Sequence, residues 1–367
     1  MMSSDLLNST YVRWMEPGPE SDIVISSRVR LARNLQTVPF PHLLDDKTGQ
    51  ACWQQITQAW QKSSLKDQLE LLSFNNLTAL DRQILMEKHL ISPNHAEANK
   101  FYQGLLVDKE GQLAIMINEE DHLRIQCLLP GLQMEECYKR AQMVDDELES
   151  NLSFAFDEQR GYLTACPTNV GTGMRASVML HLPAIVTTGQ LNAVVHYIGQ
   201  LGLTVRGIYG EGSEAMGNFF QVSNQITLGQ TEEDIIANLT AVTRQIIQQE
   251  RTLRENLKNQ MHIQLEDRVC RAYGILTNAR MITSNEALGH LSEVRLGVNM
   301  GIIDGIQPYA LNELVVAIRP AHLQKRAGRE MDPLSRDIHR AEVIKEKLTS
   351  RKAKPGSSPA AGTSEEK

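Results

Sequence analysis

Apolar and polar residues alternate most clearly between Phe101 and Leu129, and this pattern predicts β-strands. Two apolar runs, 105–107 and 113–117, flank the turn-forming stretch 108–111, so we expect a β-hairpin there. From His122 onward every second residue is apolar, which places one side of a further strand in a core. The residues on that side are Leu123, Ile125, Cys127 and Leu129.

Weaker patterns on both sides of this region predict further strands and helices. Apolar alternation predicts a strand edge at 23–30 and strands at 203–208 and 219–228. Helical spacing predicts helices at 43–90, 134–149, 191–201 and from the N-cap candidate Thr231 onward. Because helices and strands do not alternate regularly, we expect an α/β (α+β) fold with a mostly antiparallel sheet flanked by helices.

Four segments differ in character along the chain. Residues 1–22 form a polar N-terminal extension, and residues 23–254 carry the mixed pattern of the main domain. Residues 255–350 show helical spacing alone, which predicts a smaller helical C-terminal domain whose apolar faces suit dimerisation. Residues 351–367 are rich in Ala, Gly, Ser and Pro, so we expect a disordered tail.

Composition excludes several classes of protein. The chain has 367 residues, enough for two domains, and its net charge of −7 does not suggest nucleic-acid binding. Its five cysteines are scattered without a C-x-x-C pair, which argues against a zinc site or a disulfide framework. No apolar stretch is long enough to span a membrane and no signal peptide is apparent, so we expect a cytoplasmic protein.

The segment 162–180 carries the most distinctive candidate chemistry. Cys166 precedes a proline, Gly171 and Gly173 allow the backbone to approach a ligand closely, and Arg175 opens the next element. A thiol beside an arginine and exposed backbone N–H groups suits chemistry on an anion. A surface loop with a buried structural cysteine is the alternative, and these residues alone leave both interpretations open.

Four motifs in order resemble the ATP:guanidino phosphotransferases, the creatine and arginine kinase family. They are S-S-R-V-R at 26–30, N-E-E-D-H at 118–122, C-P-T-N-V-G-T-G-M-R at 166–175, and R-G followed by G-E-G between 206 and 212. The forms R-G-I-Y-G-E at 206–211 and R-D-I-H-R-A at 336–341 are similar to the bacterial protein-arginine kinase branch. The resemblance extends from about Ser26 to Lys347 and implies the antiparallel sheet that the pattern favours.

The resemblance implies an ATP site. No P-loop motif G-x-x-x-x-G-K-[ST] occurs in the chain, so other residues must hold the triphosphate. Arginine forks bind phosphate oxygens bidentately, and Arg28 and Arg30 share one side of a strand, where their charges repel without an anion. The implied ATP-binding residues are Ser26, Ser27, Arg28, Val29, Arg30, His89, Arg124, Arg175, Ala176, Ser177, Val178, Met179, Arg206, Gly207, Ile208, Tyr209, Gly210 and Glu211.

The implied catalytic residues are Glu120, Glu211 and Cys166. The two carboxylates would position the acceptor guanidinium and take its proton as the N–P bond forms. Cys166 would act as a thiolate that aligns the acceptor electrostatically, without covalent catalysis. Judged from composition alone, the N-E-E-D-H motif would be an acidic turn.

The resemblance also implies Mg²⁺ with the ATP, for which we assign no protein ligand. Glycines between 206 and 218 suggest a lid over the reaction or a flexible connector.

The acceptor implied by the resemblance is an arginine side chain in a protein. Creatine and arginine kinases carry a separate helical domain before S-x-R-V-R, but only 25 residues precede Ser26 here. We therefore expect an open acceptor site and a protein-arginine kinase. Two alternatives remain, a small-molecule guanidino (phosphagen) kinase and a non-catalytic phosphoarginine-binding adaptor.

A second, allosteric pocket is implied at Arg336, Asp337, Arg340 and Ala341. Arg336 and Arg340 share one helix face and repel unless an anion lies between them, and Asp337 would complement the guanidinium of phosphoarginine. An ordinary charged helix face is the alternative. The resemblance further implies a homodimer in stress response, an McsA-like activator, a CtsR-like repressor and a Clp ATPase as partners, with no direct nucleic-acid or membrane contact.

Overall fold

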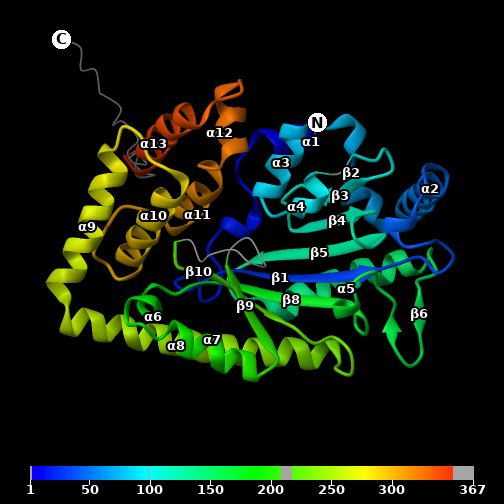
Figure 1. Cartoon of the computed structure of the whole chain (residues 1–367), viewed down its shortest axis with the longest axis horizontal. Coiled ribbons are helices and arrows are strands. Elements are labelled where there is room, and N and C mark those ends of the chain that lie inside the picture. The colour runs from blue at the N-terminus through cyan, green and yellow to red at the C-terminus, as the bar shows by residue number, and fades with distance from the viewer. Residues whose placement is uncertain (1, 98, 208–216, 350–367) are drawn as a thin grey trace, which may run out of the picture.

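A computed structural model describes residues 2–97, 99–207 and 217–349, in which one large sheet forms the centre (Figure 1). Its strand order is β2-β3-β4-β5-β1-β8-β10-β9, and all neighbouring strands are antiparallel. The strands are β1 (Val24–Arg33), β2 (Leu69–Ser73), β3 (Gly104–Asp108), β4 (Leu113–Ile117), β5 (Leu123–Pro130), β8 (Met174–His181), β9 (Leu203–Gly207) and β10 (Phe219–Asn224). The expectation of a mostly antiparallel sheet flanked by helices is confirmed.

Two details of the sheet differ from the sequence prediction. The predicted strand edge at 23–30 belongs to β1, which lies in the middle of the sheet between β5 and β8. Strand β2 lies within 43–90, a stretch predicted to form helices with a turn at Asn75 and Asn76. Its five residues are too few to set a period, and it pairs only with β3 at the sheet edge.

One face of the sheet forms the main core. In β1 the side chains of Val29 and Leu31 are buried on this face, while Arg28 and Arg30 alternate with them on the other. Helices α5 (Met134–Glu149) and α8 (Glu232–Gln260) pack on the core face. Each large apolar side chain buried there stabilises the fold by about 1.5–3 kcal/mol. On the opposite face, Arg28 and Arg30 lie beside apolar side chains that join a second core, among them Leu105, Met116 and Leu128.

The remaining helices surround this layer. Toward the N-terminal half lie α1 (Met2–Asn8), α2 (Asp46–Lys62), α3 (Ala79–Glu87) and α4 (Pro93–Ala96), and α6 (Pro183–Thr187) and α7 (Leu191–Gln200) follow β8. A small hairpin is formed by β6 (Phe156–Asp157) and β7 (Gly161–Tyr162). Among the described residues, no helix is both long and apolar enough to cross a bilayer.

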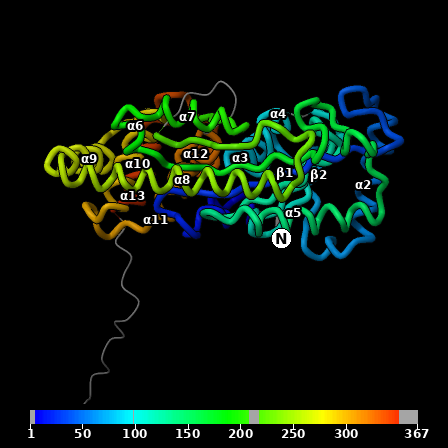
Figure 2. The backbone as a smooth tube through the Cα atoms, turned by 90° about the horizontal axis from the view of Figure 1, so that it is seen from below, coloured from blue at the N-terminus to red at the C-terminus, as the bar shows by residue number. Residues whose placement is uncertain are grey.

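The C-terminal region is entirely helical over its described residues. It consists of α9 (His262–Asn278), α10 (Ser284–Asn299), α11 (Pro308–Ala317), α12 (Pro320–Ala327) and α13 (Pro333–Thr349). These helices lie together at one end of the molecule, and the long helix α8 runs toward that end and connects to α9 (Figures 1 and 2). Helix α8 runs through the predicted boundary at residue 255 without a break. The predicted disordered tail, 351–367, lies outside the described residues.

A second core joins this helical region to the N-terminal residues. Leu291, Leu314 and Ile344 from the C-terminal helices cluster with Trp14 and Leu90. The segment predicted as a polar extension therefore contributes buried residues, because Trp14 and its neighbour Met15 are almost completely shielded from solvent.

Candidate active site

Three adjoining cavities on the face of the sheet that carries Arg28 and Arg30 form one continuous cleft. The first two share Arg28, His89 and Gln221, and the second and third share Arg30 and other arginines. We name three sections of the cleft by their lining. The inner end is lined by Trp14, Leu128, Met179, Phe219 and Val315. The arginine section contains Arg28, Arg30, Arg124, Arg175 and Arg206. The acidic end contains Glu119, Glu120, Cys166, Thr168 and Asn169.

Strand register brings the cleft arginines together. Arg30 on β1 lies directly opposite Arg175 on β8, and Arg124 on β5 lies opposite Ala32, the next residue on that face of β1. Like charges directly opposite one another destabilise a sheet. Burial, followed by the charges of Arg28, Arg124 and Arg175, holds the pKa of Arg30 well below its usual value. Its Nε is buried without a hydrogen-bond partner among the described residues. This arrangement suits a multiply charged anion.

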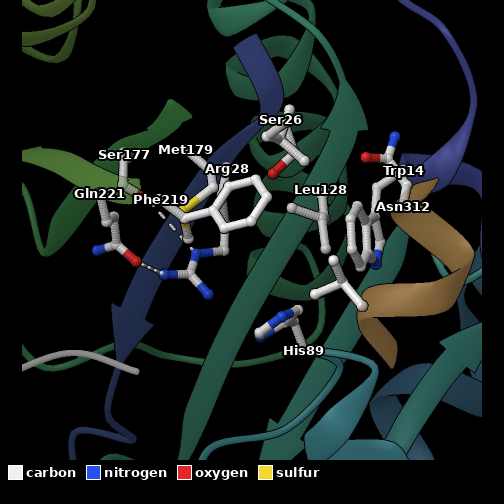
Figure 3. A pocket seen from close by; sticks show the side chains of 12 residues that line it. Trp14, Ser26, Arg28, His89, Leu128, Ser177, Met179, Phe219, Gln221 and Asn312 are labelled. Atoms are coloured by element: carbon white, nitrogen blue, oxygen red, sulfur yellow. Dashed lines mark hydrogen bonds between the residues drawn. The ribbon is translucent and has the colours of Figure 1, made fainter. Parts of the chain in front are cut away.

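Neutral side chains orient Arg28 without cancelling its charge. Its Nη2 donates to Gln221 Oε1 at 2.7 Å, and its Nε donates to Ser177 Oγ at 3.4 Å (Figure 3). Burial lowers the pKa of Arg28 to about 10, with Arg124 and Arg175 contributing further. The guanidinium thus stays charged at neutral pH and keeps donors for a ligand.

Arg124 differs from these arginines because it has an internal counterion. Its Nη1 donates to Glu119 at 2.7 Å, and Ser92 Oγ donates to the same carboxylate at 2.6 Å. Burial would raise the pKa of Glu119, but the charge of Arg124 and the hydrogen bonds from Ser92, the backbone and Arg124 together lower it to about 2. Glu119 is therefore ionised and committed to Arg124.

A tight turn between β4 and β5 separates three consecutive carboxylates. Asn118 begins it with φ of 55°, a conformation that asparagine tolerates better than most residues, and its N–H donates to the carbonyl of His122 at 2.9 Å. Asp121 turns inward and accepts from the backbone N–H of Ala165 at 2.7 Å. Glu120 remains at the cleft, and burial raises its pKa, which makes it a better proton acceptor.

Cys166 lines the same acidic end of the cleft as Glu120. Its Sγ is 3.0 Å from Thr168 Oγ1, on the short 3₁₀ helix Pro167–Asn169. Gly173 leads the loop into β8 with φ of 66°, and a Cβ there would lie 2.7 Å from the carbonyl oxygen of Ala32. Glycine is needed for this close approach of the loop to β1.

The other residues expected at an ATP site fall into three groups. Ser26, His89, Ser177, Met179 and Arg206 line the cleft. The side chains of Ser27, Val29, Ala176 and Val178 are buried on the opposite face of the sheet, because they alternate with the cleft residues. Gly207 ends β9, and Ile208, Tyr209, Gly210 and Glu211 lie outside the described residues, as does most of the expected lid.

His89 adds no positive charge to the arginine section. It has φ of 63° just after α3, and its carbonyl accepts from Gln126 Nε2 at 2.8 Å. Burial, together with the charges of Arg28 and Arg319, lowers the pKa of His89 to about 3. The imidazole is therefore neutral at physiological pH.

The residues predicted to bind phosphoarginine lie in the first half of α13. Arg340 is buried and donates to the carbonyls of Ile318 at 3.0 Å and Ile282 at 2.8 Å, and it also pairs with Asp337. Arg336 points elsewhere and donates to the carbonyl of Met331 at 2.8 Å. Ala341 is buried in the second core. Asp337 is a counterion of Arg340 in this structure.

Several cleft residues were not predicted from the sequence. Gln221 and Phe219 could have been found from strand periodicity, since they share the face of β10 that adjoins Met179. Glu119 was considered only as a neighbour of Glu120. Trp14 and the α11 residues Asn312 and Val315 carry no local signal, because only tertiary packing brings them to the cleft.

Comparison with known proteins agrees with this geometry. The ATP:guanido phosphotransferase C-terminal catalytic domain model matches residues 51–253. Taurocyamine kinase from Schistosoma mansoni, solved with bound transition state analog components, has a similar fold (TM-score 0.57, 27% identity over 64% of this chain and 34% of that duplicated chain). Lombricine kinase has a similar fold (TM-score 0.58, 22% identity, 69% of this chain and 72% of that chain). The class is that of the guanidino kinases.

Curated relatives narrow the class. A protein-arginine kinase from Syntrophomonas wolfei is 66% identical over 95% of this chain and 98% of its own length. One from Bacillus subtilis is 50% identical over 91% of this chain and 93% of its own. The C-terminal domain model of the protein-arginine kinase McsB matches residues 262–358, beginning at the first residue of α9. The chain therefore belongs to the protein-arginine kinase family of ATP:guanido phosphotransferases.

Proposed function

We propose that this protein is an ATP-dependent kinase that transfers the γ-phosphoryl group of ATP to the guanidinium of arginine residues in proteins. The observation that supports this most directly is the order of charge along the cleft. Arginines occupy its middle, and carboxylates with a thiol occupy one end. A triphosphate suits the first section and a guanidinium cation suits the second, so donor and acceptor would meet between them.

The arginine section would bind and position the donor. Phosphoryl transfer depends on positioning and on neutralising charge at the phosphoryl oxygens, which Arg28, Arg30 and Arg175 can supply through paired N–H donors. Mg²⁺ would arrive with the nucleotide and neutralise phosphate charge while phosphates and water supply most of its ligands. Among the described residues, no group of three or more His, Cys, Asp or Glu is placed to hold a metal ion.

The acidic end would bind the acceptor. A guanidinium nitrogen forms the N–P bond as the bond between the γ-phosphorus and the β,γ-bridging oxygen breaks, and ADP leaves. Glu120 accepts the proton that the nitrogen loses, since Glu119 is occupied by Arg124. Cys166, as a thiolate, would hold the acceptor cation in line. Glu211, outside the described residues, is proposed as the second carboxylate.

The proposed acceptor is a protein, by analogy with relatives named protein-arginine kinase along nearly the whole chain. A small-molecule guanidino kinase and a phosphoarginine-binding adaptor are the rivals. The presence of Glu120 and Cys166 together in the cleft argues against the adaptor.

We also propose the wider role that the resemblance implies. This role is a cytoplasmic homodimer in stress response that marks proteins for Clp proteolysis, with an McsA-like activator and a CtsR-like repressor as partners. The dimer is supported by apolar side chains that remain exposed on α9, α13 and the loop after α9, namely Ile275, Met281, Leu334 and Ile338. The phosphoarginine pocket around Arg336 is proposed as its regulatory site.

The kinase proposal is tested by supplying ATP labelled at the γ-phosphate with either a casein-like protein or free arginine. We expect acid-labile label on the protein, because an N–P bond is broken by acid, and little label on the free amino acid. Label on free arginine alone would favour the small-molecule kinase. Phosphoarginine binding without any transfer would favour the adaptor.

A further inference from the structure

The inner end of the cleft is an apolar pocket whose walls come from three separate parts of the chain (Figure 3). Leu128 and Phe219 belong to the sheet, and each is about 3% exposed. Trp14 comes from the N-terminal segment and Val315 comes from α11. Both lie outside residues 51–253, which match the catalytic domain model. The catalytic sheet alone therefore does not complete this pocket.

Charge along the cleft fixes which way a nucleotide can lie. Glu119 is paired with Arg124, so the carboxylate of Glu120 is the one that repels phosphate and leaves the acidic end to a cation. A triphosphate held by the arginine section must therefore extend its base toward the inner end. A flat purine matches that end, because aromatic and aliphatic walls favour stacking and exclude water.

We propose that Trp14 and Val315 receive the base of the nucleotide, so that the N-terminal segment and α11 complete the nucleotide site. This inference rests on the proposed kinase function and deepens it. It assigns base selection to residues beyond the catalytic motifs. It also links occupancy of the site to the docking of α11, because the base contacts both.

The walls of the pocket are held in place before any ligand binds. The indole Nε1 of Trp14 donates to the carbonyl of Lys88 at 3.2 Å, which fixes the ring beside His89. Asn312 Nδ2 donates to the carbonyl of Met15 at 2.8 Å, and Asn312 Oδ1 accepts from Arg295 at 2.6 Å. With both ends of its amide engaged, Asn312 is a positioning residue that joins α10 and α11 to the segment carrying Trp14.

The first test enlarges Val315 and compares two ligands, MgATP and magnesium tripolyphosphate, which lacks a base. In Val315→Phe we expect the affinity for ATP to fall about tenfold or more, because overpacking closes the pocket, while tripolyphosphate affinity changes less than about twofold. Ala317→Val, which enlarges another side chain of α11 that lines a different cavity, should retain both affinities. Retained tripolyphosphate binding also shows that the variant is folded.

The second test uses the fluorescence of Trp14. ATP should change tryptophan emission in the wild type and in Trp60→Phe, a control on α2, but not in Trp14→Phe. Tripolyphosphate should change none of them. ATP should also slow amide hydrogen exchange in 308–317, whereas tripolyphosphate should not.

The outcomes separate this inference from the proposed function. Unchanged ATP affinity in Val315→Phe, or equal losses for both ligands, would overturn the base site. An ATP response of equal size in Trp14→Phe would do the same. A wild type that binds ATP at this site but phosphorylates no arginine would overturn the kinase proposal alone.

Discussion

Two groups of arginines in this protein serve opposite purposes. In the cleft, Arg28 and Arg30 are crowded by other arginines, and both have a lowered pKa. On α8, Arg254 pairs with the buried Glu250, and on α13, Arg340 pairs with Asp337 and two backbone carbonyls. The first group has excess positive charge within its own surroundings, and the second is neutralised internally.

This difference shows how to separate arginines that bind a ligand from arginines that hold a fold. A buried charge is tolerated when the protein supplies its counterion, and it is unfavourable when the protein does not. The cleft group reduces folding stability, and a bound polyanion would compensate for it. Arg124 lies between the two groups, because Glu119 neutralises it at the edge of the cleft.

The largest effect on activity is expected from Arg30→Gln. Loss of a charged contact to the transferred phosphoryl group should slow transfer about 100- to 1000-fold. The free energy of unfolding, measured in urea without ligand, should stay the same or rise, because the repulsion with Arg175 is relieved. A clear loss of stability would place Arg30 in the structural group and break the comparison.

Glu120→Gln should slow phosphoryl transfer about a hundredfold, because the arginine guanidinium loses the carboxylate that takes its proton. ATP affinity, measured by calorimetry, should be nearly unchanged because Glu120 lies at the acidic end. Glu119→Gln is the matched control, one residue away. Glu119→Gln should remove the counterion of Arg124 and therefore change the affinity for ATP more than Glu120→Gln does. Identical effects of both substitutions would mean that the turn does not separate the carboxylates' roles.

Arg340→Gln should lower the free energy of unfolding by about 3 kcal/mol, because it leaves two backbone carbonyls and Asp337 without their partner. Urea denaturation measures the change. Basal phosphorylation at saturating ATP should survive in the folded fraction. A variant as stable as the wild type would show that Arg340 is not structural and would move it to the ligand-binding group.

The pH dependence of stability tests the excess positive charge of the cleft at His89. Its pKa is about 3 in the folded protein against 6.5 ordinarily, so between these values the unfolded chain binds more protons. Stability must then fall as the pH drops through that window. Urea denaturation across the window should show a shallower fall for His89→Gln than for the wild type. Equal slopes would mean that the folded protein tolerates a charged His89 beside the arginines.

Periodicity predicted the elements of the sheet well but not their neighbours in space. Helix 134–149 and the buried side of β5 were predicted as they occur, because each has a long and regular pattern. The central place of β1 could not be predicted, since its partners are about a hundred residues or more away in the sequence.

The site residues likewise divide into those that local motifs predicted and those that depend on tertiary packing. Motif resemblance brought Arg28, Glu120 and Cys166 to one cleft, since each lies in a distinctive local pattern. It could not separate Ser27 and Val29 from their cleft-facing neighbours until the strand's two faces were known. Trp14 and Val315 needed the packing of two distant segments. The bonds from Arg340 to the carbonyls of Ile282 and Ile318 were likewise not expected, because a helical wheel does not show backbone carbonyls of other segments.

The smallest effect is expected from Arg336→Ala, which tests whether the helical region also binds a ligand. Arg340 is occupied, so a phosphoarginine at α13 would rely on Arg336 for its phosphate and on Asp337 for its guanidinium. Calorimetric titration of free phosphoarginine should show about tenfold weaker binding to the variant, with unchanged stability, because Arg336 has only one backbone contact of this kind to lose. Arg326→Ala, which removes an exposed arginine of α12 paired with Glu346, should bind like the wild type. If Arg336→Ala also binds like the wild type, the start of α13 is an ordinary charged helix face, and Arg336 does not belong to the ligand-binding arginines.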